Sequence, residues 1–408
     1  MRVRGNLNGS CEETQMEEKA FLEGITRRDF SKAATAAAVG LTVAGGISRA
    51  AEEGVKEKEA PKEEAKAPKI PLRDLGKTGL KVTEISLGTM EVTDAAVVEK
   101  AIDEGCNYVD TAASYQGGRN EEMVGTVMAR RRKEVTLATK FSQSDDKEKI
   151  FRSVDRSLRR LQTDVIDVIQ VHNVTDASPV KEAVYKEAFD ELKGQGKVRF
   201  LGFTTHSGQE KVINACIAAG YVDVMLVGFG ATDPPEVADA IKRAREAGIG
   251  IVIMKSLKGV DKFKGRTSGP TPYQLALRWV LDKPYIDTVA VGMTSFAQLE
   301  EDMKALHVKL SVLDKVQLQR FARACATTTC SLCGRCNKCA QGVKVGEIMR
   351  AHMYAHSYGN VKKARSEFLE MGGPAMLAAC KDCGACEKNC PRKLQIRERF
   401  REVSSLIA

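Results

Sequence analysis

The 408-residue sequence contains no apolar run of the length that a membrane-spanning helix needs, which is about 20 residues. It also lacks a glycine fingerprint of the dinucleotide-binding type. Three of its five histidines, His307, His352 and His356, show no ligand spacing with other types of metal-binding residue. The net charge of +9 is spread along the chain, and the basic cluster 130–133 is more typical of a solvated helix end than of a nucleic-acid site. These absences argue against a nucleic-acid-binding protein and against a Rossmann-type dinucleotide site.

Cysteine, in contrast, is plentiful: eight of the twelve cysteines fall in two tight runs near the C-terminus. Their members are Cys330, Cys333, Cys336 and Cys339 in the first run, and Cys380, Cys383, Cys386 and Cys390 in the second. Two residues between thiolates, and proline after the last cysteine, are typical of bacterial 4Fe-4S ferredoxins. Structural zinc and disulfides are the alternatives, and a third cysteine in each run argues against both.

In two-cluster ferredoxins each run gives its last cysteine to the other cluster. That pattern predicts one cluster on Cys330, Cys333, Cys336 and Cys390, and a second on Cys380, Cys383, Cys386 and Cys339.

The forty residues between the runs show helix-like periodicity, in Val345 to Tyr354 and Val361 to Met371, and no strand alternation. Residues 311–408 are therefore predicted to form a mainly helical domain with two 4Fe-4S clusters. It resembles the cluster-bearing domain of succinate dehydrogenase iron-sulfur subunits. Cys325 is expected to pack inside a helix rather than to bind a cluster, and Cys106 and Cys216 are expected to be buried thiols.

The first fifty residues resemble a twin-arginine export signal. Thr26 to Lys32 reads TRRDFSK, a weakly apolar stretch from Ala33 to Gly46 follows, and Ser48 to Ala50 is a small-x-small cleavage site. The alternative is an alanine-rich amphipathic helix, and Met16 is a second possible initiator. The resemblance implies the export machinery as a partner and a location in the periplasm or on the outer face of the membrane. Residues 51–70, rich in Glu, Lys, Ala and Pro, are predicted to be a disordered charged linker.

Residues 71–310 alternate short β-branched runs with longer amphipathic ones, which is typical of repeated strand-helix units. Eight units in this length predict a (β/α)8 barrel. The expected strands are Glu84 to Leu87, Asn107 to Asp110, Val135 to Thr139, Val165 to Val171, Val198 to Phe203, Val222 to Val227, Ile249 to Met254 and Thr288 to Val291.

Polar residues at strand ends matter in this fold, because the catalytic face lies at the carboxyl ends of the strands. Four residues stand at such places: Asp110, Tyr115, Lys140 and His172. Singly, an Asp can cap a helix, a Lys can be solvated and a His can simply be packed. Four at successive strands predict a common site at the barrel mouth.

Several motifs resemble the aldo/keto reductase family: Leu75-Gly76-Lys77-Thr78-Gly79, Asp110-Thr111-Ala112-x2-Tyr115, Ala138-Thr139-Lys140, Ser157-Leu158-x-Arg160-Leu161 and Gly196-Lys197-Val198-Arg199. The resemblance covers the barrel and extends to a subgroup with a C-terminal ferredoxin module. It implies hydride transfer between a nicotinamide and a carbonyl or alcohol, with Tyr115 as proton donor. Lys140 would lower the pKa of Tyr115, Asp110 would orient Lys140, and His172 would bind the carbonyl oxygen.

The resemblance also implies cofactor contacts, with NADP or NAD left open because Gln298 stands where a cation often holds the 2′-phosphate. Besides Asp110, the expected contacts are Gly88, Thr89, Met90, Thr204, Thr205, Phe229, Gly292, Thr294, Gln298, Glu301 and Asp302. Phe229 is expected to offer a substitute face for the nicotinamide ring.

Three functions are compatible with these features. The leading one is an exported oxidoreductase for a small carbonyl or alcohol substrate whose two clusters relay electrons, with a redox partner protein possible. The alternative is an electron-transfer protein whose barrel does not turn over substrate. In the third, the clusters only stiffen the C-terminal fold of a reductase.

Overall fold

The computed structural model describes residues 70–263 and 269–406. The predicted export signal, 1–50, and the linker up to residue 69 lie outside the described residues.

A short antiparallel hairpin precedes the barrel and was not predicted from the sequence. Its strands are β1 (Leu72–Asp74) and β2 (Lys81–Thr83). Gly76 in the turn has a φ of 54°, and a Cβ there would lie 2.3 Å from the backbone nitrogen of Gly250. Its amide donates to Asp287 Oδ2 at 3.0 Å, so the hairpin packs against the segments that lead into the last two barrel strands.

The central sheet is a closed barrel of eight parallel strands, which confirms the predicted (β/α)8 fold. All eight predicted strands are present, with ends shifted by at most three residues. They are β3 (Ile85–Gly88), β4 (Tyr108–Asp110), β5 (Thr136–Ser142), β6 (Ile166–His172), β7 (Val198–Thr205), β8 (Val224–Gly228), β9 (Gly250–Met254) and β10 (Thr288–Val291). Strand β10 pairs with β3 to close the ring, with Val289 opposite Ile85.

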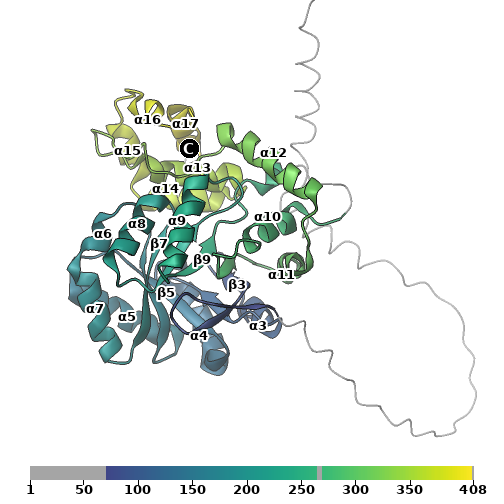
Figure 1. Cartoon of the computed structure of the whole chain (residues 1–408). Coiled ribbons are helices and arrows are strands. Elements are labelled where there is room, and N and C mark those ends of the chain that lie inside the picture. The colour runs from purple at the N-terminus through teal and green to yellow at the C-terminus, as the bar shows by residue number, and fades with distance from the viewer. Residues whose placement is uncertain (1–69, 264–268, 407–408) are drawn as a thin grey trace, which may run out of the picture. The chain divides into compact units, whose positions relative to one another are not determined.

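Amphipathic helices surround this barrel (Figure 1). In α5 (Lys147–Leu161), for example, Ile150, Val154 and Leu158 recur at helical spacing and are buried, while Asp146 caps the first turn by accepting from the amide of Lys149. The other helices of this part are α3 (Ala95–Asp103), α4 (Arg119–Arg131), α6 (Ser178–Lys181), α7 (Ala183–Gly194), α8 (Gln209–Ala219), α9 (Pro235–Glu246), α10 (Pro272–Leu281) and α11 (Phe296–Met303). Short 3-10 turns are η1 (Tyr115–Gly118), η2 (Arg132–Glu134), η3 (Val260–Lys262) and η4 (Lys304–His307).

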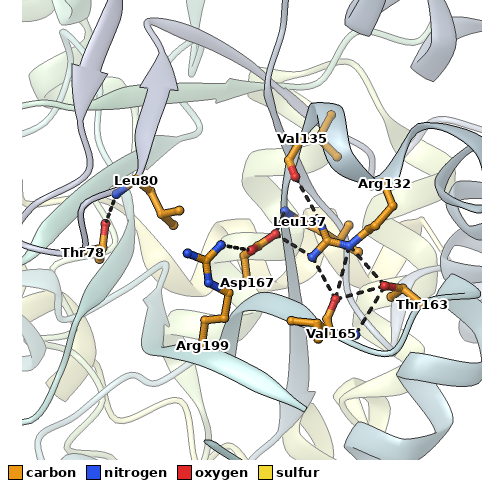
Figure 2. A network of polar contacts seen from close by, with 9 residues as sticks. All are labelled: Thr78, Leu80, Arg132, Val135, Leu137, Thr163, Val165, Asp167 and Arg199. Atoms are coloured by element: carbon orange, nitrogen blue, oxygen red, sulfur yellow. Dashed lines mark hydrogen bonds and ion pairs between the residues drawn. The ribbon is translucent and has the colours of Figure 1, made fainter. Parts of the chain in front are cut away.

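A buried carboxylate ties neighbouring strands together near their amino ends (Figure 2). Asp167 of β6 accepts from Arg132 Nη2 and from Arg199 Nη1, both at 2.7 Å, and from the amide of Leu137 at 2.8 Å. Arg131 of the same basic cluster pairs with Asp103 and with Glu134. Arg131 and Arg132 are therefore both engaged in ion pairs within the protein, as expected if the basic cluster 130–133 has a structural role.

After the barrel, helix α12 (Val312–Thr328) packs on α10. Leu318, Phe321 and Cys325 share an apolar cluster with Leu275 of α10 and with Phe263. Cys325 is 2% exposed, as expected for a packing residue. Cys106 and Cys216 are likewise buried, and burial raises the pKa of the Cys106 thiol to about 12.

The C-terminal region has the predicted helical character. It contains α13 (Val345–Ser357), α14 (Val361–Glu370), α15 (Gly373–Ala379), α16 (Ala385–Lys388) and α17 (Ile396–Ser405), and no strand lies between 311 and 406. Ile348, Phe368 and Phe400 meet in its core. Within the parts of the chain that the structure describes, none of the helices combines the length and the apolar character needed to cross a membrane.

Candidate functional site

Barrel geometry gathers the four predicted catalytic residues at one end of the sheet. Asp110 and His172 are the last residues of β4 and β6, Lys140 lies two residues before the end of β5, and Tyr115 begins η1. Parallel strands present their carboxyl ends on the same face, so these side chains meet although up to 62 positions separate them along the chain.

Lys140 and Asp110 form a buried ion pair. Lys140 Nζ lies 2.6 Å from Asp110 Oδ2 and donates to the carbonyl oxygen of Thr111 at 2.5 Å, while Gln170 donates to the other carboxylate oxygen at 3.1 Å. The two charged side chains are 0% and 5% exposed. Burial raises the pKa of Asp110 and lowers the pKa of Lys140, and their mutual attraction opposes both shifts.

The ring of Tyr115 lies between this pair and His172. Lys140 Nζ is 4.7 Å from the centroid of the Tyr115 ring, and the rings of Tyr115 and His172 meet edge to face at 5.9 Å. The expectation that Lys140 lowers the pKa of Tyr115 is not what the structure gives. Burial raises the pKa of Tyr115 well above 10, and the Asp110 carboxylate adds to the rise. The positive charge of Lys140 is already balanced by Asp110, so the phenol keeps its proton at neutral pH.

Two histidines at the mouth are uncharged at neutral pH. Burial, followed by the positive charge of Lys140 for His172 and of Arg350 for His206, holds the pKa of each imidazole well below 6.5. His172 Nδ1 lies 3.3 Å from Ser114 Oγ, and His206 Nδ1 lies 3.1 Å from Asn173 Oδ1. Each ring therefore has its orientation fixed by one polar neighbour.

A cavity of about 1010 Å³ opens at Tyr115 and His172. Residues of the barrel line it together with Arg350 and Tyr354 of α13. Cys333 and Cys339 of the first cysteine run line the same cavity. The predicted catalytic residues and the cysteine-rich region therefore face a common space.

Lys255, which was not predicted from the sequence, directly follows β9 and has a φ of 60°. Its Nζ donates to Tyr354 Oη at 2.8 Å and lies 4.4 Å from the centroid of that ring. Burial lowers the pKa of Lys255 to about 7, Arg350 and Lys363 add to the drop, and Glu367 opposes it. The strand-end rule that selected Lys140 applies to Lys255 as well, so its position was available from the sequence.

Arg350 was also missed. This residue is 8% exposed, and its guanidinium pairs with Glu347 at 2.6 Å and with Glu367 at 2.8 Å. No strand-end rule applies to a residue inside a helix, and it reaches the site only because α13 lies over the barrel mouth.

The predicted nicotinamide contacts are only partly accessible. Met90 lines the cavity, and Gly88 ends β3. Thr89 is buried and donates to the carbonyl oxygen of Asp110 at 3.0 Å. The hydroxyl of Thr204 accepts from the amide of Asn173 at 2.8 Å, and the hydroxyl of Thr205 donates to the carbonyl oxygen of Ser207 at 2.9 Å.

The ring of Phe229 is 1% exposed and lies 5.6 Å from the ring of Trp279. A buried ring already packed on tryptophan offers no open face, so the expected substitute platform is covered in this structure.

The predicted adenosine loop is also only partly accessible. Gly292 and Thr294 are exposed, and Gln298 accepts from the amide of Thr294 at 2.9 Å. Glu301 and Asp302 are buried, and Glu301 accepts from the hydroxyl of Thr271 at 2.9 Å.

The structure brings one predicted cysteine set together. Cys330, Cys333, Cys336 and Cys390 line a single cavity with Pro391, although Cys390 comes from the second run. The amide of Leu332 donates to Cys330 Sγ at 3.4 Å. In the second set, Cys339, Cys380 and Cys386 pack against the apolar core of the C-terminal region, and Cys383 is exposed. None of the eight forms a disulfide.

Residues 84–260 match the model of the aldo/keto reductase family. The barrel therefore resembles an aldo/keto reductase domain over most of its length. It shares 37% identity over 149 residues with the oxidoreductase YqkF of Bacillus subtilis (strain 168), covering 33% of this chain and only 48% of YqkF. It shares 28% identity with the oxidoreductase YrpG of the same strain, over 58% of this chain and 91% of YrpG.

The holo form of aldo-keto reductase AKR11C1 from Bacillus halodurans superimposes with a TM-score of 0.55 at 26% identity, covering 62% of this chain and 97% of that one. The aldo/keto reductase range contains all four catalytic candidates and Lys255, whereas the cysteine runs lie beyond it.

Proposed function

We propose that this protein is an exported oxidoreductase that interconverts a small carbonyl compound and its alcohol at Tyr115, with two 4Fe-4S clusters carrying electrons. One observation supports it above the others: Tyr115 and His172 share a cavity with Cys333 and Cys339. A cavity of this size has room for a nicotinamide ring and a small substrate.

Each catalytic side chain has a role that follows from its surroundings. Tyr115, protonated at neutral pH, gives its proton to the carbonyl oxygen as negative charge develops there. Uncharged His172 donates a hydrogen bond to the same oxygen and so orients the substrate. Lys140, fixed by Asp110, holds a positive charge beside the phenol. Family membership is consistent with NADPH or NADH, which supplies hydride when bound, and Met90 would contact it at the cavity.

The cysteines suit clusters better than zinc. Tetrahedral zinc at about 2.3 Å from each sulfur would place the sulfurs about 3.8 Å apart. Within 70–263 and 269–406, no three cysteine sulfurs lie within 4.8 Å of one another. In a 4Fe-4S cluster each thiolate binds a different iron, so the sulfurs stand farther apart. Cys330, Cys333, Cys336 and Cys390 would hold one cluster, and Cys380, Cys383, Cys386 and Cys339 the other.

The nicotinamide would give both electrons to the carbonyl carbon as hydride, so the clusters would exchange electrons with the nicotinamide and not with the carbonyl. Each cluster exchanges one electron when bound, and a pair matches the two electrons of one hydride. A redox partner protein would deliver or collect these electrons. Export by the twin-arginine route is proposed from residues 26–50, because that route carries proteins folded with their cofactors in place.

A second function is favoured by the covered nicotinamide contacts. Thr204 and Thr205 are fully buried with their hydroxyls engaged, and the Phe229 ring is packed on Trp279. An electron-transfer protein whose barrel does not turn over substrate would need none of these surfaces.

The two functions are separated by adding NADPH, then NADH, to the anaerobically purified protein while visible absorbance and electron paramagnetic resonance are recorded. The leading proposal expects the clusters to become reduced, and expects a panel of aldehydes to be reduced by wild type but not by Tyr115→Phe. Tyr285→Phe, which alters a tyrosine that none of the contacts above places at the site, is the control. Clusters that stay oxidised with both nucleotides yet respond to dithionite, with no aldehyde turnover, would favour the electron-transfer protein.

A further inference from the structure

A cluster of two histidines and one glutamate lies in the C-terminal region, apart from the cysteines. His352 and His356 are one turn apart on α13, and their rings stack with centroids 4.2 Å apart and planes 22° apart. Glu402 comes from α17, with its Oε2 atom 2.6 Å from His352 Nε2 and 3.7 Å from His356 Nε2. One ligand atom from each residue lies within 4.8 Å of the other two.

The positions of these side chains suit a site with one protected side and one open side. His352 is 8% exposed, so its ring is held by the protein on most sides. The side chains of His356 and Glu402 are each 42% exposed. An ion held here would therefore take its remaining ligands from water.

The separations are close to those that an ion requires. Zinc binds imidazole nitrogen and carboxylate oxygen at about 2.0 to 2.2 Å, so tetrahedral ligand atoms stand about 3.4 Å apart. The two separations from Glu402 Oε2, 2.6 Å and 3.7 Å, bracket that value. A hydrogen bond between His352 and Glu402 explains why these two side chains lie together. A bound ion explains the position of His356 in the same cluster as well.

We propose that His352, His356 and Glu402 bind one divalent transition-metal ion of the zinc class. Two imidazoles and a carboxylate form a donor set that zinc uses in proteins, with the fourth position left to water. Such an ion would link α13 to α17. Because α13 also carries Arg350 and Tyr354, the bound ion would fix the position of one wall of the cavity at the barrel mouth.

The test adds Zn²⁺ to the anaerobically purified full chain and measures zinc and iron content together with the zinc X-ray absorption spectrum. We expect one zinc beyond the cluster iron, with nitrogen and oxygen neighbours near 2.0 to 2.1 Å and no sulfur near 2.3 Å. We also expect zinc to raise the melting temperature of wild type.

The half-exposed ligand His356 gives the main variant, because replacing it should not impair folding. His356→Ala should weaken zinc binding at least about tenfold, a loss that removal of even an outer-shell partner can cause, with iron content and visible absorbance unchanged. Glu402→Gln should act in the same direction, and His307→Ala is the matched control away from the cluster. Sulfur neighbours around the zinc, equal binding by His356→Ala and wild type, or absence of stoichiometric zinc in wild type would each overturn the proposal.

Discussion

The ion pair between Lys140 and Asp110 gives the sharpest energetic prediction. Its atoms are 2.6 Å apart and its side chains are 0% and 5% exposed, so removing one partner leaves the other charge buried and unpaired. Lys140→Met should therefore lower the free energy of unfolding by about 3 to 5 kcal/mol. It also removes the hydrogen bond to the carbonyl oxygen of Thr111.

The double variant makes the prediction specific to the pair. Asp110→Asn alone should lower the free energy of unfolding by about 3 kcal/mol. The double variant with Lys140→Met should lower it by much less than the sum of the two single effects, because neither charge then remains unpaired. Urea unfolding followed by circular dichroism measures all four proteins. The exposed pair Lys186 and Asp190, with a separation of 2.5 Å and side chains 53% and 55% exposed, supplies the control Lys186→Met. The reasoning is refuted if Lys140→Met destabilises no more than this control, or if the two single effects simply add.

Three further predictions follow from named contacts. Asp167→Asn should cost about 2 to 4 kcal/mol in urea unfolding, because it weakens bonds to two arginines and a backbone amide; a change under about 0.5 kcal/mol would contradict this. Lys255, with a folded pKa of about 7 and an ordinary pKa near 10.5, binds a proton on unfolding between these values. Stability should therefore rise with pH from 7 to 9 by up to about 1.4 kcal/mol per unit, and Lys255→Met should flatten that slope. Cys390→Ser should lower iron content and visible absorbance, whereas Cys325→Ser should leave both unchanged; equal iron in the two variants would contradict the assignment of Cys390.

The barrel was predictable because each strand carries its own local signal. In the segment from Ile249 to Met254, for example, the three successive β-branched residues Ile251, Val252 and Ile253 are all buried, as expected when both faces of a parallel strand are covered. The hairpin of Leu72–Asp74 and Lys81–Thr83 escaped prediction because three-residue strands are too short to show alternation. What fixes the hairpin is contact with distant residues, such as the bond from Gly76 to Asp287.

Only part of the candidate site, likewise, could be predicted from the sequence. Asp110, Lys140 and His172 could be predicted because parallel topology converts strand ends into one surface, whatever lies between them in the sequence. Arg350 and Tyr354 could not be predicted as part of the site. The helical periodicity of the sequence indicates which face of α13 is apolar, but not which surface of the protein that helix covers. Glu402 is similar, since only the packing of α17 on α13 places it beside His352.

Helix α13 bears on what the candidate catalytic residues imply about the substrate. Arg350 and Tyr354 line the same cavity as Tyr115 and His172, and Arg350 is already paired with Glu347 and Glu367. A substrate of the proposed reaction would therefore lie between this neutralised charge network and the phenol of Tyr115. Since Lys255 also bonds to Tyr354, barrel and helix are joined at the point where selection occurs. In the proposed function, the contact between Lys255 and Tyr354 would couple substrate binding to the region that carries the cysteines.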